Sequence, residues 1–461
     1  MAKGASISGF PEWLPSERVV EQRVIDTLRN VFELNGFIGI ETRAVEQGSS
    51  LLKKGETSKE IYLLSRLQEV GHESDTPIED RLGLHFDLTV PLSRYVVEHS
   101  GDLAFPFKRW QIQKVWRGER PQEGRFREFV QADIDVIGNG DLPDHYEVEL
   151  PLVMVSALER LREFGLPKAT VHANNRKLSE GFYRGLGLTD IEGVLREIDK
   201  LDKIGSDKVR VLLVEECGVE EAKADEILTF IAIRGTNGEV LSALEQYRGR
   251  NEVFDQGLDE LSSVTKLLGA FGVPEENFAV DLTIARGLDY YTGTVYETTL
   301  LDHPEIGSVC SGGRYDNLAE YYTDRPLPGV GISIGLTRLF YVLNEQRMLN
   351  EERVMAPADV MIVPMTDDLE AAVRLATELR AQNIRVQLYA EQKKFKAKIQ
   401  YADKLHIPYV IFLGEDEINS KTASVKCLAT GEQTSVSIAE LPAFLAAGLA
   451  GQDQNTVILE K

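Results

Sequence analysis

Residues 129–137 place the strongest constraint on the fold of this chain. Apolar residues alternate there with polar ones: Val130, Ala132, Ile134 and Val136 against Gln131, Asp133 and Asp135. A period of two is typical of a β-strand, whose successive side chains point to opposite faces of a sheet. The segment is therefore predicted to be a strand with one face in a core. Its other face places an amide and two carboxylates beneath a polar site.

Other segments add strands to this sheet. Residues 84–89 alternate in the same way, and we expect Thr89 to cap a helix whose second residue is Pro91. Residues 330–334 alternate up to the predicted start of another helix. Further short strands are predicted in residues 278–284 and 308–310. Many strands in succession, with few strand–helix–strand units between them, favour an antiparallel sheet.

The chain is too long for one hydrophobic core, because it has 461 residues. We predict an α+β fold with a first domain at residues 1–350, interrupted by a helical insertion at about 190–265 where charged helical stretches replace the strands. From residue 358 to 461 the pattern becomes strand, helix, strand, helix, strand. This pattern is typical of a small α/β domain with mainly parallel strands.

The charge of the chain limits its partners. A formal net charge of −23 argues against indiscriminate binding of nucleic acid, which depends on Lys and Arg contacts to phosphates. Charges are screened over about 8 Å at physiological salt, so a local basic patch can still bind an anionic ligand. Basic residues cluster in residues 108–127 and 393–404. For either cluster alone, a solvated surface is the plainer interpretation.

Compartment and metal use are also constrained. No apolar run approaches the roughly 20 residues that span a bilayer, and the N-terminus lacks an apolar secretory segment. The three cysteines lie far apart in the sequence, which suits a reducing compartment. We therefore expect a cytoplasmic protein without a membrane partner. The seven histidines show no metal-ligand spacing, so no structural metal is expected.

The sequence contains no P-loop, no G-x-G-x-x-G fingerprint and no H-E-x-x-H motif. It does place arginines at the predicted ends of strands and helices: Arg117, Arg125, Arg127, Arg286 and Arg338. Each alone is more simply explained as a salt-bridge partner. Together they predict a phosphate site built from guanidinium groups, which suits a transferring phosphoryl group.

At these arginines the sequence resembles the class II aminoacyl-tRNA synthetases. Residues 117–129 (RGERPQEGRFREF) resemble the second motif of that class, and residues 331–338 (GISIGLTR) its third. Residues 285–297 (ARGLDYYTGTVYE), 311–316 (SGGRYD) and 84–95 (LHFDLTVPLSRY) resemble the histidine-specific family within the class. Residues from 358 onward resemble its anticodon-binding domain. Arg43 stands where the first motif of the class usually has a proline.

The resemblance implies an ATP site. Arg117 would hold the α-phosphate and the substrate carboxylate, as a catalytic residue. Phe126 and Arg338 would sandwich the adenine, and Glu119 would hydrogen-bond its amino group. Arg125 would contact the terminal phosphates, which Mg²⁺ accompanies.

The resemblance also implies a site for L-histidine. Asp87, Thr89 and Gln131 would receive the α-amino group. Asp135 and Tyr291 would hydrogen-bond the imidazole, with Tyr290 close by. Arg286 resembles the distinctive catalytic arginine of the family, which works at the α-phosphate, and we assign it to the histidine site as well.

The implied reaction joins L-histidine to tRNA(His) in two steps, through histidyl-adenylate. Arg120 and Gln122 in the motif 2 loop would approach the acceptor end of the tRNA, and the cluster at 393–404 would help the last domain hold it. A homodimer is expected from the family. The alternative is a catalytically silent relative that senses histidine, the regulatory subunit of ATP phosphoribosyltransferase. Such proteins generally lack both the anticodon domain and the catalytic arginine.

Overall fold

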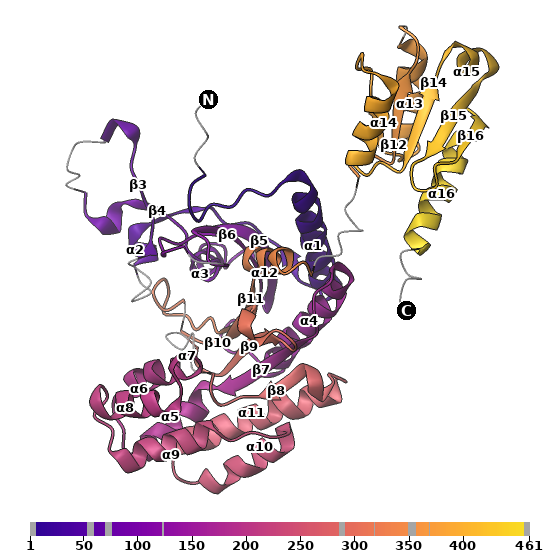
Figure 1. Cartoon of the computed structure of the whole chain (residues 1–461). Helices are drawn as coiled ribbons and strands as arrows, with labels where there is room; N and C mark the ends of the chain where they lie inside the picture. Colours follow the sequence, from indigo (N-terminus) through magenta and orange to yellow (C-terminus); the bar gives the residue numbers. More distant parts are fainter. Residues whose placement is uncertain are drawn as a thin grey trace. The chain divides into compact units, whose positions relative to one another are not determined.

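The computed structural model describes residues 6–52, 60–69, 76–121, 124–284, 291–317, 319–348, 356–367 and 369–455. The chain divides into two compact units. One comprises Met1–Leu14 and Glu21–Asn350, and the other comprises Pro15–Val20 and Glu351–Lys461. Each unit has its own main sheet (Figure 1).

Within the described residues, the first unit is built on an eight-stranded sheet. Its strands, in spatial order, are β1 (Ile38–Gly39), β5 (Phe107–Trp116), β6 (Glu128–Ile137), β11 (Gly329–Gly335), β10 (Cys310–Tyr315), β9 (Thr294–Leu300), β7 (Ala169–Asn175) and β8 (Phe278–Val280). Neighbouring strands are antiparallel except for the parallel edge pairs β1–β5 and β7–β8. The predicted α+β class and antiparallel sheet are confirmed, and β6 covers the segment on which the prediction was based.

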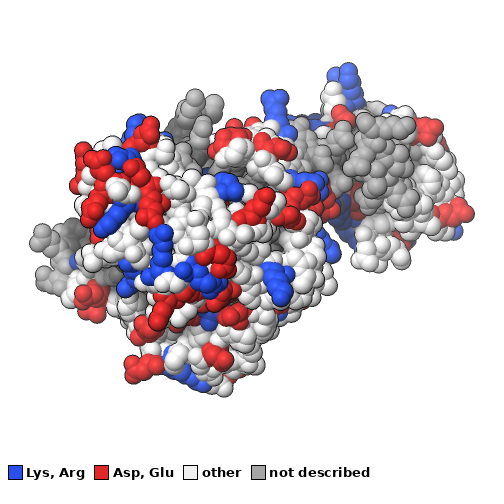
Figure 2. All heavy atoms as spheres, turned by 90° about the horizontal axis from the view of Figure 1, so that it is seen from below, with Lys and Arg blue, Asp and Glu red and all other residues white. Residues whose placement is uncertain are grey.

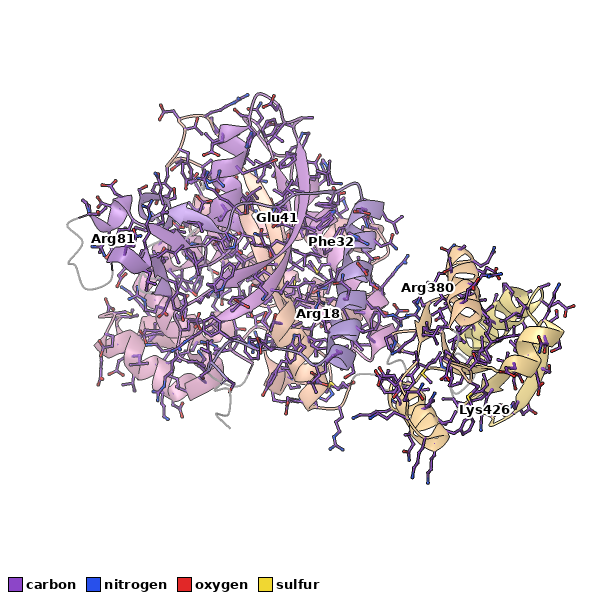
Figure 3. All side chains as sticks on the ribbon, turned by 90° about the horizontal axis from the view of Figure 1, so that it is seen from above. Arg18, Phe32, Glu41, Arg81, Arg380 and Lys426 are labelled. Atoms are coloured by element: carbon purple, nitrogen blue, oxygen red, sulfur yellow. The ribbon has the colours of Figure 1, made fainter. Side chains whose placement is uncertain are left out.

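The core of this unit lies against the apolar side of the central strands. Ala132, Ile134 and Val136 of β6 are fully buried. Helix α4 (His145–Leu161) packs against β6, β7 and β11, and α12 (Leu336–Glu345) packs against β6 and β11. Phe32 on α1 (Pro15–Leu34), labelled in Figure 3, is also fully buried.

The strand predicted at 84–89 is wrong beyond Leu84. Strand β4 (Leu82–Leu84) pairs with β2 (Val45–Gln47) and β3 (Leu63–Leu64), near the short helix α2 (Gly48–Leu51). The chain then turns into α3 (Thr89–Glu98), because an Asp87 carboxylate oxygen accepts the backbone N–H of Val90 at 3.1 Å. Thr89 is the first helical residue and not the cap, so that prediction is also wrong. Asp87 satisfies the helix N-terminus in its place.

The predicted strand at 278–284 is shorter than expected. It ends at Val280, because the Asp281 carboxylate accepts the backbone N–H of Thr283 at 3.0 Å and closes a turn. The strand predicted at 308–310 begins only at Cys310 and runs on to Tyr315.

Helices gather beside β7 and β8 (Figure 1). They are α5 (Arg176–Gly185), α6 (Ile191–Ile198), α7 (Leu201–Ile204), α8 (Ser206–Glu215), α9 (Glu221–Ile231), α10 (Asn237–Leu244) and α11 (Glu252–Ala270). Two glycines let α5 and α11 approach closely. A β-carbon on Gly181 would lie 2.1 Å from the backbone nitrogen of Phe254, and one on Gly257 would lie 2.2 Å from that of Leu178.

The second unit contains a five-stranded sheet in its described part. Its strands, in spatial order, are β13 (Val386–Leu388), β12 (Val360–Pro364), β14 (Tyr409–Leu413), β15 (Thr422–Cys427) and β16 (Gln433–Ser437). Its helices are α13 (Glu370–Ala381), α14 (Phe395–Lys404), α15 (Glu415–Ser420) and α16 (Leu441–Asn455). The first three strands are parallel, as predicted, whereas β15 and β16 add an antiparallel hairpin that was not predicted.

Side-chain contacts fix helices onto this second sheet. Arg380 of α13, labelled in Figure 3, donates a hydrogen bond to the Val386 carbonyl at 2.8 Å. Among the helices of the described residues, none is long and apolar enough to cross a membrane.

Candidate active site

A cleft of about 1410 Å³ opens over the polar face of β6. Its walls come from the turn before α3, the loop between β5 and β6, helices α5 and α6, strands β9, β10 and β11, and the start of α12. Segments more than 200 residues apart in the sequence therefore meet around one cavity.

Most of the residues predicted for the site line this cleft. They are Asp87, Thr89, Arg117, Glu119, Arg125, Phe126, Gln131, Asp135, Tyr291 and Arg338. Arg120 is exposed and is not part of the lining. Gln122, Arg286 and Tyr290 lie outside the described residues.

One end of the cleft is rich in guanidinium groups. Arg117 donates from Nε to the Phe86 carbonyl at 3.0 Å, and its guanidinium lies 5.1 Å from the centre of the Phe129 ring. Glu119 lies between two arginines, with its carboxylate 3.9 Å from Arg117 Nη1 and 3.4 Å from Arg125 Nη1. About a third of the Arg117 side chain is exposed, so its remaining N–H groups can reach an anion in the cleft.

Arg338 is positioned by backbone carbonyls. It donates to the carbonyl of Ile306 at 2.7 Å and to that of Ser308 at 3.4 Å. Gly124, at a φ of +69°, packs against its side chain, where a β-carbon would lie 3.5 Å from Arg338 Cγ. Phe126 meets Tyr341 edge to face, with ring centres 5.3 Å apart. The arginine and the aromatic ring thus come from different segments and line one cleft.

The other end of the cleft is acidic. Asp87, Gln131, Asp133 and Asp135 are all more than nine-tenths buried. Gln131 donates from Nε2 to the Ser333 hydroxyl at 2.8 Å. This places the amide oxygen of Gln131 next to the carboxylates on the same face of β6.

Asp135 is held by two residues that the sequence did not single out for the site. Arg109 is fully buried and places Nη2 2.7 Å from Asp135 Oδ2, while the Tyr315 hydroxyl donates to Asp135 Oδ1 at 2.5 Å. Burial and the neighbouring Asp135 charge raise the pKa of Tyr315 well above its usual value, so this phenol stays protonated and donates. Gly331 leaves room for the carboxylate, because a β-carbon there would lie 2.0 Å from Asp135 Oδ1.

Arg109 lies on the same face of β5 as Gln111 and Gln113 and is directly opposite Asp135 in the β5–β6 register. This polar face is a local signal, but the pairing with Asp135 depends on the order of the strands. Tyr315 gave no comparable signal, since its partner Asp135 lies two strands away. This contact can be predicted only when the order of the strands in the sheet is known.

Asp133 occupies the middle of the acidic end. Burial raises its pKa to about 7, and the charges of Asp135 and Asp87 act in the same direction. The Arg109 guanidinium, 3.9 Å away, and the Ser333 hydroxyl oppose this shift. Near neutral pH Asp133 is therefore partly protonated.

The two ends have opposite chemical preferences. Guanidinium groups with an adjacent aromatic ring suit phosphates and a planar base. Buried carboxylates and an amide oxygen suit a cationic amine and a ring with two nitrogen atoms. A cleft with both ends can hold an amino acid and a nucleotide side by side.

The sequence and the fold match known proteins over nearly their whole length. The family model described as histidyl-tRNA synthetase matches residues 9–339, and the model described as anticodon binding domain matches residues 359–447. The chain belongs to the histidyl-tRNA synthetase family. Its relatives include a histidine–tRNA ligase of Bifidobacterium longum subsp. infantis, which is 65% identical over 94% of this chain and 96% of the relative.

A solved structure of the family agrees with this assignment. The histidyl-tRNA synthetase of Nostoc sp. PCC 7120 superposes with a TM-score of 0.85 at 38% identity, covering 97% of this chain and all of that one. A Bacillus halodurans protein described as an ATP phosphoribosyltransferase regulatory subunit/histidyl-tRNA synthetase superposes with a TM-score of 0.68 over 89% of this chain and 97% of that one. At 21% identity, that likeness extends to the fold alone.

Proposed function

We propose that this cleft activates L-histidine with ATP and transfers it to tRNA(His). The observation that carries the proposal is the pairing, in one cavity, of an arginine-rich end with a buried acidic end on β6. Ligation of histidine to tRNA is also the activity named for relatives that share 65% of their residues with this chain over nearly its full length.

In the first step, an oxygen of the histidine carboxylate attacks the α-phosphorus of ATP. The bond to the β-phosphate oxygen breaks, which gives histidyl-adenylate and pyrophosphate. Arg117 would hold the carboxylate and the α-phosphate together, and Arg125 would neutralise the terminal phosphates that leave. The Phe86 carbonyl, which accepts from Arg117 Nε, leaves this guanidinium little freedom to lose on binding.

The nucleotide base would lie between Phe126 and Arg338, with Glu119 accepting from its amino group. Magnesium would enter as part of the ATP substrate, bound mainly by phosphate oxygens and water. No group of three or more His, Cys, Asp or Glu side chains suited to a metal ion occurs among the described residues.

On the acidic side, Asp87, Thr89 and Gln131 would receive the α-amino group. Asp135 and Tyr291 would face the imidazole. Arg109 and Tyr315 would fix the Asp135 carboxylate in place. As the family resemblance implies, Arg286 would act at the α-phosphate and at the histidine site, and Tyr290 would lie close to the imidazole.

In the second step, a hydroxyl of the terminal ribose of tRNA attacks the activated carbonyl, and AMP leaves. Arg120 and Gln122 would approach the acceptor end. Three exposed lysines at the start of α14, Lys393, Lys394 and Lys396, stand beside the half-exposed ring of Phe395. A basic surface with an exposed aromatic ring suits single-stranded nucleic acid, so this face would contact the anticodon loop.

The proposal extends to a cytoplasmic homodimer. Arg43, which replaces the usual motif 1 proline, forms an ion pair with the buried Glu46 of the same chain at 3.1 Å.

The regulatory-subunit alternative is not favoured, because the chain has an anticodon-binding domain and relatives named as ligases.

Histidine-dependent exchange of labelled pyrophosphate into ATP tests the proposal. Pure protein with magnesium should catalyse exchange with L-histidine and at least about 100-fold more slowly with other amino acids, because unmatched polar groups in the pocket penalise them. Binding of histidine without any exchange would instead identify a histidine sensor.

A further inference from the structure

Two buried acceptors on β6 have no partner among the residues that the structure describes. Gln131 Oε1 and Asp133 Oδ1 are both inaccessible to solvent and accept no hydrogen bond from those residues. The two residues are 8% and 2% exposed and line the cleft at neighbouring positions on one face of the strand. Buried polar atoms without partners are rare in folded proteins, and no described residue donates to either of these two.

The charges around Asp133 also favour a cation. The groups facing it are Asp135 on β6, Asp87 before α3, Arg109 on β5, and the Cys310 thiol on β10, whose own pKa is raised by burial. The Arg109 guanidinium is committed to Asp135, at 2.7 Å, and lies 3.9 Å from Asp133. The charges of Asp135 and Asp87 thus act against the ionised form of Asp133, whereas Arg109 and the Ser333 hydroxyl stabilise it.

We infer that Asp133 binds the α-ammonium group of histidine, together with Gln131 and Asp87. An ammonium carries three N–H donors and can reach several acceptors at once, whereas each imidazole nitrogen offers at most one. This assignment rests on the proposed function and adds to it a specificity residue that the family resemblance did not supply.

The contact couples the binding of histidine to the release of a proton from Asp133. In the empty cleft near pH 7, Asp133 holds a proton for part of the time. When the ammonium arrives, the acid releases this proton to solvent and the carboxylate pairs with the cation. Roughly half a proton should leave per histidine bound at pH 7.

Titration calorimetry with two ligands tests the contact. L-histidine carries the ammonium, whereas 3-(imidazol-4-yl)propionate keeps the ring and the carboxylate but lacks the amine. Asp133→Asn should weaken histidine binding about 10- to 100-fold and leave the affinity for the deamino ligand within about 2-fold of wild type. Asp102→Asn removes an exposed carboxylate away from the cleft and should change neither affinity.

Repeating the titrations in buffers of different ionisation enthalpy counts the protons released. The protonation of each free ligand's own imidazole, measured by titrating the ligand alone, is subtracted first. After this correction, wild type should release more protons with histidine than with the deamino ligand, and Asp133→Asn should abolish that difference. Equal corrected release from wild type with both ligands would overturn the inference, and this measurement does not depend on the folding of any variant.

Two other outcomes would also overturn it. If Asp133→Asn bound histidine as tightly as wild type, Asp133 would not touch the substrate. If the variant lost affinity for both ligands equally, Asp133 would bind the imidazole ring or support the fold, and would not bind the ammonium group. A wild-type protein that bound no histidine would instead remove the proposed function together with the inference.

Discussion

At the scale of single residues, β6 concentrates more buried charge than the fold alone requires. Asp133 and Asp135 share one buried guanidinium, that of Arg109. Burial of a carboxylate without a full partner lowers stability, since the charged form loses its hydration. A cationic ligand bound beside these carboxylates would offset this loss of stability.

The stability of the ligand-free protein should therefore depend on pH through Asp133. Its folded-state pKa of about 7 lies above the ordinary value of 3.8, so the folded state binds a proton that the unfolded state releases. Stability contributed by this proton is present below about pH 4 and is lost as pH rises toward 7. Asp133→Asn should remove that loss and raise Tm by a few degrees at pH 8, with a smaller gain at pH 5.

Differential scanning calorimetry of both proteins between pH 5 and 8 measures this effect, with Asp102→Asn as the control for lost charge. Curves of Tm against pH that run parallel for wild type and Asp133→Asn would contradict it.

The residues of the site were predictable to different degrees. Gln131 and Asp135 followed from the alternation along one strand. The partners of Asp135 did not, because Tyr315 reaches it across β11 and Arg109 comes from the other neighbouring strand. Local sequence determines which face a side chain takes, whereas contacts between strands depend on the order of the sheet.

At the scale of elements, the contact between α5 and α11 depends on two glycines. Replacing Gly181 or Gly257 with alanine would place a methyl group within about 2.2 Å of the facing backbone. The helices would have to separate, at a cost of about 1–3 kcal/mol for each substitution. Amides of α5 and α11 should then exchange faster in hydrogen–deuterium exchange, and Tm should fall.

The second glycine of α11 provides a matched control. Gly269 has no atom near its would-be β-carbon, so Gly269→Ala should stabilise the helix by about 0.5–1 kcal/mol. Similar exchange rates in all three variants would show that the close approach is not needed.

Element boundaries were harder to predict than element types. The alternation of residues 84–89 correctly indicated buried Phe86 and Leu88, yet the Asp87 carboxylate turned the backbone before a longer strand could form. The hairpin β15–β16 lacked a helix-spaced or strongly apolar pattern, since one face of β16 is exposed. Side-chain hydrogen bonds to the backbone decide such boundaries, and the hydrophobic periodicity of the sequence does not reveal these bonds.

At the scale of the whole molecule, a net charge of −23 must coexist with a polyanionic partner. Figure 2 shows acidic and basic side chains interspersed over the face of the first unit seen from below. Binding of tRNA would therefore depend on local basic groups, and the lysines around the start of α14 are the strongest candidates in the second unit.

Substituting Lys393, Lys394 and Lys396 together with glutamine should raise the KM for tRNA about 10-fold and lower its salt dependence by up to about three ion equivalents. Pyrophosphate exchange should be unchanged, because it needs no tRNA. Arg374→Gln removes an exposed charge from α13 and serves as the control. An unaltered KM for tRNA in the triple variant would leave these lysines as ordinary solvated residues.

The close fit between Gly331 and Asp135 has a consequence for how this protein can change over generations. The two residues face each other across neighbouring strands, and any side chain at 331 would occupy the space of the carboxylate. A side chain at 331 is thus tolerated only if residue 135 becomes smaller or moves away. As long as the acid at 135 is retained, the position opposite it is therefore restricted to glycine.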